Sequence, residues 1–163
     1  MSVSRIAVDH VRVVADKPFD VVAKAFEQQL GRFNSEVVSQ SLAAGEEAEK
    51  VRTKIEAMAG PSGFMLFQTS DHGALLRLTG QRKKAIQYVV GNPLIAIQMT
   101  QHDIRSGLYA PLRVLIYENP EGKTCVEYDK PSSLFGQFGN PKVSEVAATL
   151  DQKLEQLVAK AIQ

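Results

Sequence analysis

The chain has 163 residues, and its 19 lysines and arginines against 18 aspartates and glutamates give a formal net charge of +1 at pH 7. This length suits one domain, 1–163, with a core that needs neither disulfides nor a structural metal. The near balance of charge gives no general attraction to nucleic acid or to an anionic membrane. The single cysteine, Cys125, excludes an internal disulfide and a cysteine-based zinc site.

The N-terminus and the hydropathy pattern predict a cytoplasmic protein without membrane association. No apolar run approaches the roughly 20 residues that span a bilayer. The first ten residues, MSVSRIAVDH, lack the apolar region of a signal peptide.

The first third of the chain predicts one strand and two helices. Residues 3–14 are rich in Val and Ile with partial alternation, which indicates a strand. Asp16, Lys17 and Pro18 then begin a helix that Gly31 closes. A polar connection over 32–40 leads to a narrow apolar stripe, which predicts a peripheral, mobile surface helix over 41–58.

The middle of the chain predicts a meander of three strands. The segments 64–70, 74–80 and 84–90 are rich in apolar and β-forming residues. Asp71, His72 and Gly73 separate the first two as a hairpin connection, so we expect 74–80 to pair back on 64–70.

The segment Gly91–Glu118 predicts a capped helix followed by a buried strand. Asn92 is a good N-cap, and Pro93 fits the first helical position because its missing N–H would be unpaired there. The helix should run over 92–105 and end at Gly107. In the strand 112–118, successive side chains should point alternately to the core and to the opposite face of the sheet. Leu112, Val114 and Ile116 point one way; Arg113, Leu115 and Tyr117 point the other.

The remaining residues complete an α+β pattern. Residues 123–129 read as the hairpin partner of 112–118, and 130–139 as an irregular connection with one short helical turn. Asn140 and Pro141 open a long amphipathic helix that ends near Ile162. The short turns favour a two-layer α+β fold, with a curved, mostly antiparallel sheet and amphipathic helices on one face.

Three segments of the C-terminal half resemble the family called domain of unknown function 302, a group of small bacterial proteins. They are NPLIA (92–96), PLRVLIYE (111–118) and DKP (129–131), and the terminal helix fits as well. The resemblance implies a fold similar to that of the TATA-binding protein, and it implies no activity, substrate or cofactor. Many members carry a cysteine before the Asn-Pro pair, where this chain has Gly91. The region 32–62 fits poorly and is interpreted as a variable insertion.

Arg113 and Tyr117 are the favoured ligand-binding residues. Both lie on the sheet face away from the predicted core, where an arginine fork could bind a small carboxylate or phosphate. Asn92 and the N-terminal N–H groups of its helix could add a second anion contact. The alternative role for Arg113 is a cross-strand ion pair with Glu127.

A second group of titratable residues lies at the end of the helix 92–105. His102, Asp103, Arg105 and Tyr109 suggest, as an alternative, a small hydrolase- or isomerase-like enzyme, although adjacent helix residues point about 100° apart. His10, His72 and His102 show no paired metal-ligand spacing, so we predict no metal and no cofactor.

The sequence therefore predicts a module of unknown biochemical function that binds a small anionic ligand or a partner, with no role in nucleic-acid binding. Arg113, Tyr117, Asn92, His102 and Tyr109 are its candidate ligand-binding residues. We also expect a homodimer, because a sheet with helices on one face leaves apolar side chains partly uncovered. Phe64, Phe67, Tyr88, Leu115 and Tyr117 are the candidates for that apolar patch.

Overall fold

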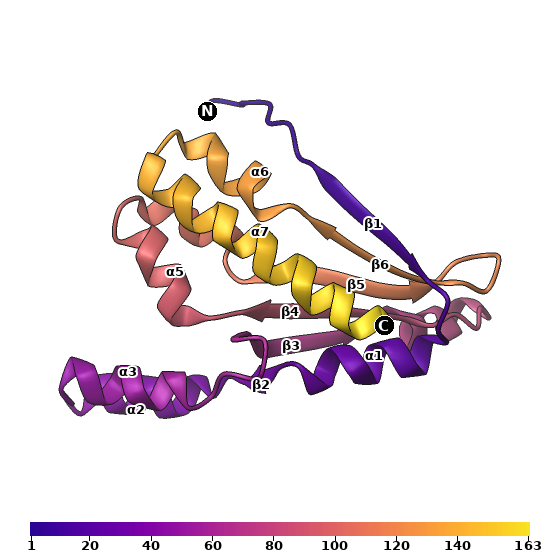
Figure 1. Cartoon of the computed structure of the whole chain (residues 1–163), viewed down its shortest axis with the longest axis horizontal. Coiled ribbons are helices and arrows are strands. Elements are labelled where there is room, and N and C mark those ends of the chain that lie inside the picture. The colour runs from indigo at the N-terminus through magenta and orange to yellow at the C-terminus, as the bar shows by residue number, and fades with distance from the viewer.

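The computed structural model describes residues 1–163 and contains a six-stranded sheet with the order β1-β6-β5-β4-β3-β2 (Figure 1). The strands are β1 (His10–Ala15), β2 (Gly31–Arg32), β3 (Met65–Asp71), β4 (Ala85–Gly91), β5 (Leu112–Glu118) and β6 (Thr124–Asp129). The first five strands in this order form four antiparallel pairs, and the two-residue strand β2 pairs parallel with β3. The mostly antiparallel sheet of the predicted α+β fold is confirmed.

Two helices, α1 (Phe19–Gln28) and α7 (Pro141–Ile162), pack against each other on one face of the sheet (Figure 1). The predicted core stripe of α7 is buried, as are the alternate residues of β5 that face it. These residues are Val143, Leu150, Leu154 and Leu157 of the helix, and Leu112, Val114 and Ile116 of the strand. None of the helices combines the length and apolar composition that a bilayer crossing requires.

The two Asn-Pro pairs start helices as predicted. Asn92 caps α5 (Pro93–Thr100), and Asn140 caps α7, each by accepting a hydrogen bond from a backbone N–H two residues on. The prediction that the first of these helices continues to Gly107 is wrong. Asp103 accepts a hydrogen bond from the N–H of Arg105 and so caps a separate 3-10 helix, η2 (Ile104–Tyr109), which contains Gly107.

The segment 74–80 is helical, so the predicted hairpin strand there is wrong. It forms α4 (His72–Leu75) and the 3-10 helix η1 (Leu76–Thr79), and β3 pairs with β4 instead. Asp71 accepts a hydrogen bond from the N–H of Ala74 at 2.8 Å, which makes Asp71 an N-cap rather than a turn residue. Gly80, with a φ of 76°, then ends the helical run.

The predicted single helix over 41–58 is two helices, α2 (Ser35–Ala43) and α3 (Ala48–Glu56), which project beside the sheet as an arm (Figure 1). Asn34 caps α2 from within the segment expected to be an irregular polar connection. Gly45, at a φ of 67°, turns the chain between the helices. The arm buries Ser41, Val51 and Ile55 and little else.

Two boundaries near the N-terminus also differ from expectation. The first strand begins at His10 rather than at residue 3, because its partner β6 ends at Asp129, opposite His10. The first helix begins at Phe19 with Pro18 in the capping position and no side-chain cap. Asp16 does not cap it; its carboxylate lies 3.5 Å from Nζ of Lys123.

The short segment after β6 forms α6 (Pro131–Phe135) and the 3-10 helix η3 (Gly136–Phe138), in keeping with the helical turn expected there. The ring of Phe135 is fully buried in the core. Phe138 is half-buried, and the guanidinium of Arg105 lies 5.2 Å from the centre of its ring.

Candidate functional site

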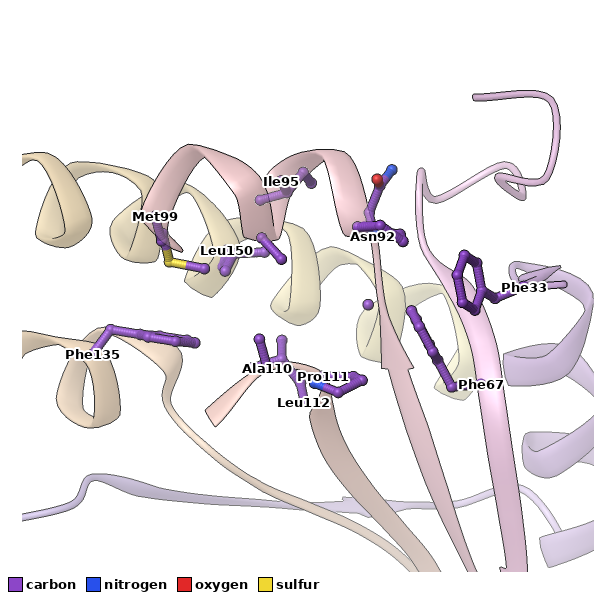
Figure 2. A pocket seen from close by; sticks show the side chains of 13 residues that line it. Phe33, Phe67, Asn92, Ile95, Met99, Ala110, Pro111, Leu112, Phe135 and Leu150 are labelled. Carbon is purple, nitrogen blue, oxygen red and sulfur yellow. The ribbon is translucent and has the colours of Figure 1, made fainter. Parts of the chain in front are cut away.

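An apolar pocket of about 250 Å³ lies where β4 ends and α5 begins, at Gly91, Asn92 and Pro93 (Figure 2). Phe33 and Phe67 lie at one end of the pocket, and Met99 and Phe135 lie at the other (Figure 2). The remaining lining residues are Ile95, Ala96, Ala110, Pro111, Leu112 and Leu150. Residues that are far apart in the sequence, from Phe33 to Leu150, thus line a pocket with almost no polar surface.

Asn92 fixes the geometry of this pocket. Its Oδ1 accepts a hydrogen bond from the N–H of Leu94 at 2.9 Å, and its Nδ2 donates one to the carbonyl of Gly63 at 2.8 Å. The first bond starts α5, and the second ties that helix to the turn before β3. Both ends of the Asn92 amide therefore already have protein partners, and its role as an anion contact stays a prediction.

Phe67 reaches the pocket from an irregular position in β3. The register of β3 with β4 shifts between Leu66 and Gln68, so Phe67 has no opposite residue in the ladder. Such a bulge redirects a side chain that strict alternation would place on the other face. The ring of Phe67 packs on that of Phe33, with the two centroids 4.5 Å apart. Phe33 was assigned to a polar connection in the sequence, and no local pattern marks it as a pocket residue.

Gly91 lies between Pro111 and Phe67 in the lining of this pocket. A Cβ atom built on it would lie 3.3 Å from Cβ of Pro111 and 3.5 Å from the ring of Phe67. Glycine here leaves space that any other side chain would fill. The residue type at position 91 therefore sets the free volume between Phe67 and Pro111.

A second hollow, of about 500 Å³, lies beside the first and shares Ala110, Pro111 and Leu112 with it. It brings together Arg113 and Tyr109, two of the predicted ligand-binding residues. Its other lining residues are Val89, Leu108, Asp129 and Leu134. The Arg113 side chain is exposed and makes no ion pair or hydrogen bond within the protein.

The alternative ion pair between Arg113 and Glu127 does not form, so that prediction is wrong. In the register of β5 with β6, Glu127 lies opposite Leu115, and Arg113 lies one pair beyond Val114 and Tyr128. Glu127 is instead bound by groups nearer to it. The guanidinium of Arg12 lies 3.2 Å from Oε1 of Glu127, and the hydroxyl of Tyr117 donates to the same oxygen at 2.5 Å.

The open face of the sheet carries a hydrogen-bonded network centred on Glu127. Nε2 of His10 lies 3.0 Å from Oε2 of Glu127, and Nδ1 of His10 lies 2.9 Å from Asp129. These two carboxylates raise the pKa of His10 above its usual value, because they stabilise the imidazolium. Partial burial acts to raise the pKa of Glu127, but its bonds to Tyr117 and His10 outweigh this and lower the pKa.

Tyr117 belongs to this network rather than to a free binding surface. Its hydrogen bond to Glu127, followed by partial burial, raises the pKa of the phenol. Cys125 lies on the same face, buried, with its Sγ 3.6 Å from the guanidinium of Arg12. The structure therefore places Tyr117 and Arg113 on one face, as predicted, but with different surroundings.

The residues proposed for an enzyme at the end of α5 make separate contacts. The side chain of His102 is exposed and makes no hydrogen bond, and only its backbone carbonyl accepts one, from Asn140. Asp103 binds Arg105 at 2.6 Å, and this bond lowers the pKa of Asp103. Tyr109 packs edge-on against Phe135. No three His, Cys, Asp or Glu side chains converge in a way that could hold a metal ion.

The fold and these pockets define a small α+β domain that encloses an apolar space at the end of its sheet. The family model described as domain of unknown function DUF302 matches residues 40–161, so the chain belongs to this family. The match begins inside the segment 32–62 that was interpreted as an insertion, and the family has no assigned biochemical function.

A solved structure has the same fold. The crystal structure of an uncharacterized conserved DUF302 protein from Bacillus stearothermophilus superimposes with a TM-score of 0.65. The two sequences are 17% identical, and the alignment covers 93% of this chain and 97% of the other. A comparison with curated proteins finds no match.

Proposed function

We propose that this protein is a small-molecule-binding module whose ligand occupies the apolar pocket at Gly91 and Asn92. One observation carries the proposal: a pocket of about 250 Å³ at the start of α5 is lined almost entirely by apolar side chains, two of which are the packed rings of Phe33 and Phe67. Empty space of this size removes packing contacts from the side chains around it, and a ligand would restore them. The hydrogen bonds of Asn92 to Gly63 and Leu94 hold this end of the pocket in place within the protein itself.

The lining specifies a compact apolar ligand group. An engineered apolar cavity of about 150 Å³ binds benzene, so this pocket has room for a single or fused aromatic ring or a short branched chain. At one end of the pocket, an aromatic ring of the ligand could pack against the tilted rings of Phe33 and Phe67. No charged side chain lines the pocket, so a group buried there should be neutral.

Ligand-induced stabilisation tests this proposal. Indole, benzyl alcohol and benzoate are suitable probes, and a ligand present at about 100 times its dissociation constant adds roughly 2.7 kcal/mol to the free energy of unfolding. For a chain of this size that corresponds to a rise of about 5–10 °C in melting temperature. We expect at least one aromatic probe to give such a rise in the wild-type protein.

Gly91→Ala supplies the matched test, because its new methyl group occupies the space between Phe67 and Pro111. Each variant's shift is measured from its own melting temperature. The control is Gly136→Ala, where an added Cβ would meet nothing within 4 Å. We expect a reduced shift in the first variant and an unchanged shift in the second. Equal shifts in both variants, or no shift in the wild type, would contradict the proposal.

A second candidate is an anion site at Arg113, because this unpaired guanidinium shares a hollow with Tyr109 and apolar side chains. The one carboxylate in the lining, Asp129, is already bound to His10. An arginine fork binds a carboxylate through two parallel hydrogen bonds, which lysine does not reproduce. Benzoate should therefore stabilise the wild type more than benzyl alcohol, and Arg113→Lys should remove that difference. If benzoate still stabilises Arg113→Lys more than benzyl alcohol does, by the same amount as in the wild type, the anion site at Arg113 is refuted.

A further inference from the structure

We propose that the segment joining β3 to β4, residues 72–84, docks on the surface of an anionic lipid bilayer. Leu75 and Leu78 are 62% and 87% exposed. They lie three residues apart in the consecutive helical turns α4 and η1, so they share one side of that turn. The protein thus presents a small apolar edge to its surroundings.

The turn that presents these leucines is rigidly built. Asp71 caps it, and Gly73 packs so tightly that a Cβ there would lie 2.4 Å from the carbonyl of Lys83. The left-handed Gly80 then reverses the chain. The leucines are therefore held outward by local structure and do not fold back on the core.

The same segment carries unpaired cations. The segment contains Arg77, Arg82, Lys83 and Lys84 and no acidic residue. Lys84 is bound to Asp20 and lies near Glu118, but the other three have no acidic partner. Apart from Glu118, the hollow they line, about 640 Å³ in volume, has only cationic, amide and glycine residues around it. It offers a lipid phosphate several donors at once.

This pairing of exposed leucines with free cations is what an anionic bilayer recognises. Leucines enter the boundary of the acyl chains, while lysine and arginine remain at the phosphates. A nucleic acid would use the cations and leave the leucines exposed. The net charge of +1 hides this feature, because acidic residues elsewhere in the sequence offset the local cations.

A contrasting apolar pair lies in η2, beyond the opposite end of β4. Ile104 and Leu108 are 79% and 76% exposed, but the neighbouring Arg105 is neutralised by Asp103. Arg113, which lines a hollow with Leu108, is the one unpaired cation near this pair, whereas the segment 72–84 has three. If exposure alone attracted membranes, this pair would bind as well as the leucines of 72–84. The larger number of free cations favours the segment 72–84 as the docking surface, and Ile104 provides an internal control.

Co-sedimentation with vesicles tests the proposal. The full chain is mixed with vesicles of phosphatidylcholine alone or of phosphatidylcholine with phosphatidylglycerol. We expect binding to the anionic vesicles and little binding to the neutral ones. Arg82→Gln with Lys83→Gln should lower the partition coefficient by roughly 30-fold, since each cation near an anionic surface contributes a factor of about five. Leu75→Ser with Leu78→Ser should lower it by at least about tenfold.

Two controls distinguish binding through this surface from non-specific adsorption to vesicles. Ile104→Ser removes an apolar side chain of similar exposure, and Lys50→Gln with Arg52→Gln removes two charges from the arm; neither should change binding. Three results would overturn the proposal. They are no binding of the wild type to anionic vesicles, an equal loss in the controls, and a loss on removing the cations but none on removing the leucines. The last would indicate a soluble polyanion, such as an acidic protein segment, as the partner.

Discussion

The hydroxyl of Tyr88, on the buried face of β4, donates a hydrogen bond of 2.9 Å to the carboxylate of Glu27 on α1. Tyr88 is fully buried, and its ring packs on Phe26 of the same helix with the centroids 5.1 Å apart. Burial, and then the nearby carboxylate, raises the pKa of the phenol. One side chain thus joins the middle of the sheet to the helix by both a polar and an apolar contact.

The two partners of this bond should respond differently to mutation. Tyr88→Phe removes the hydroxyl with its bond and should cost about 0.5–1.5 kcal/mol. Glu27→Ala leaves the buried hydroxyl without an acceptor and should cost about 1–3 kcal/mol. Urea denaturation measures both. A larger loss in Tyr88→Phe than in Glu27→Ala would show that water satisfies the hydroxyl.

Leu154→Ala should strongly destabilise the protein. The side chain is fully buried between α7 and the sheet, and such truncations usually cost about 2–5 kcal/mol. The melting temperature should fall by roughly 5–15 °C. The exposed neighbour Gln156→Ala is the matched control and should stay close to wild type. A melting curve of Leu154→Ala that coincides with the wild type would refute the packing of this helix.

The contribution of His10 to stability should depend on pH in a defined direction. Its folded pKa is raised by Asp129 and Glu127, so its bonds contribute fully below the unfolded pKa of about 6.5. The contribution is lost as the pH rises through the folded pKa. The side chain is 51% exposed and Arg12 also neutralises Glu127, so the effect should be small. His10→Gln should therefore be more destabilising at pH 5 than at pH 8.5; the reverse order would contradict the assignment.

The arm formed by α2 and α3 should open before the sheet. Its buried residues Val51 and Ile55 contact only a small satellite cluster around Met65, whereas β5 lies within the main core. Hydrogen exchange should therefore be faster over 35–56 than over 112–118. Equal protection of the two segments would mean that a second chain holds the arm.

A homodimer stays a prediction, and its basis is narrower than the sequence suggested. Phe64 and Tyr88, expected to be uncovered, are fully buried. Phe67, Leu115 and Tyr117 remain partly exposed, and Ile104 and Leu108 add exposed apolar surface near the second hollow. Light scattering at micromolar concentration should give about twice the chain mass of 17.9 kDa. A mass near 17.9 kDa would refute the dimer.

Local signals in the sequence predicted the elements that they control. Asn92 and Asn140 mark helix starts through their own side-chain bonds, and the alternation in β5 assigns Val114 and Arg113 to opposite faces. The segment 74–80 is helical and not a strand as predicted, because the spacing of its apolar residues fits both a strand and a helix. The hydrogen bond by which Asp71 caps α4 favours the helix. The sequence alone does not show whether an aspartate belongs to a turn or caps a helix.

The candidate site was less predictable because it depends on contacts between distant residues. Arg113 misses Glu127 because the hairpin pairs Leu115 with Glu127, and a different register would have changed the partner. The pocket needs Phe33 from the connection between β2 and α2, Phe67 from a bulge and Leu150 from the last helix. Of the five residues predicted to bind a ligand, only Asn92 lines this pocket.

The order of the strands has a consequence for how the chain folds during synthesis. β1 is made before the other strands of this sheet, but its partner β6 ends 119 residues after His10. β1 therefore cannot join the sheet until β6 has been made, and contacts between such distant residues form slowly. Until then the N-terminal strand has unpaired backbone groups along both edges, which makes it a natural target for chaperones that bind extended segments.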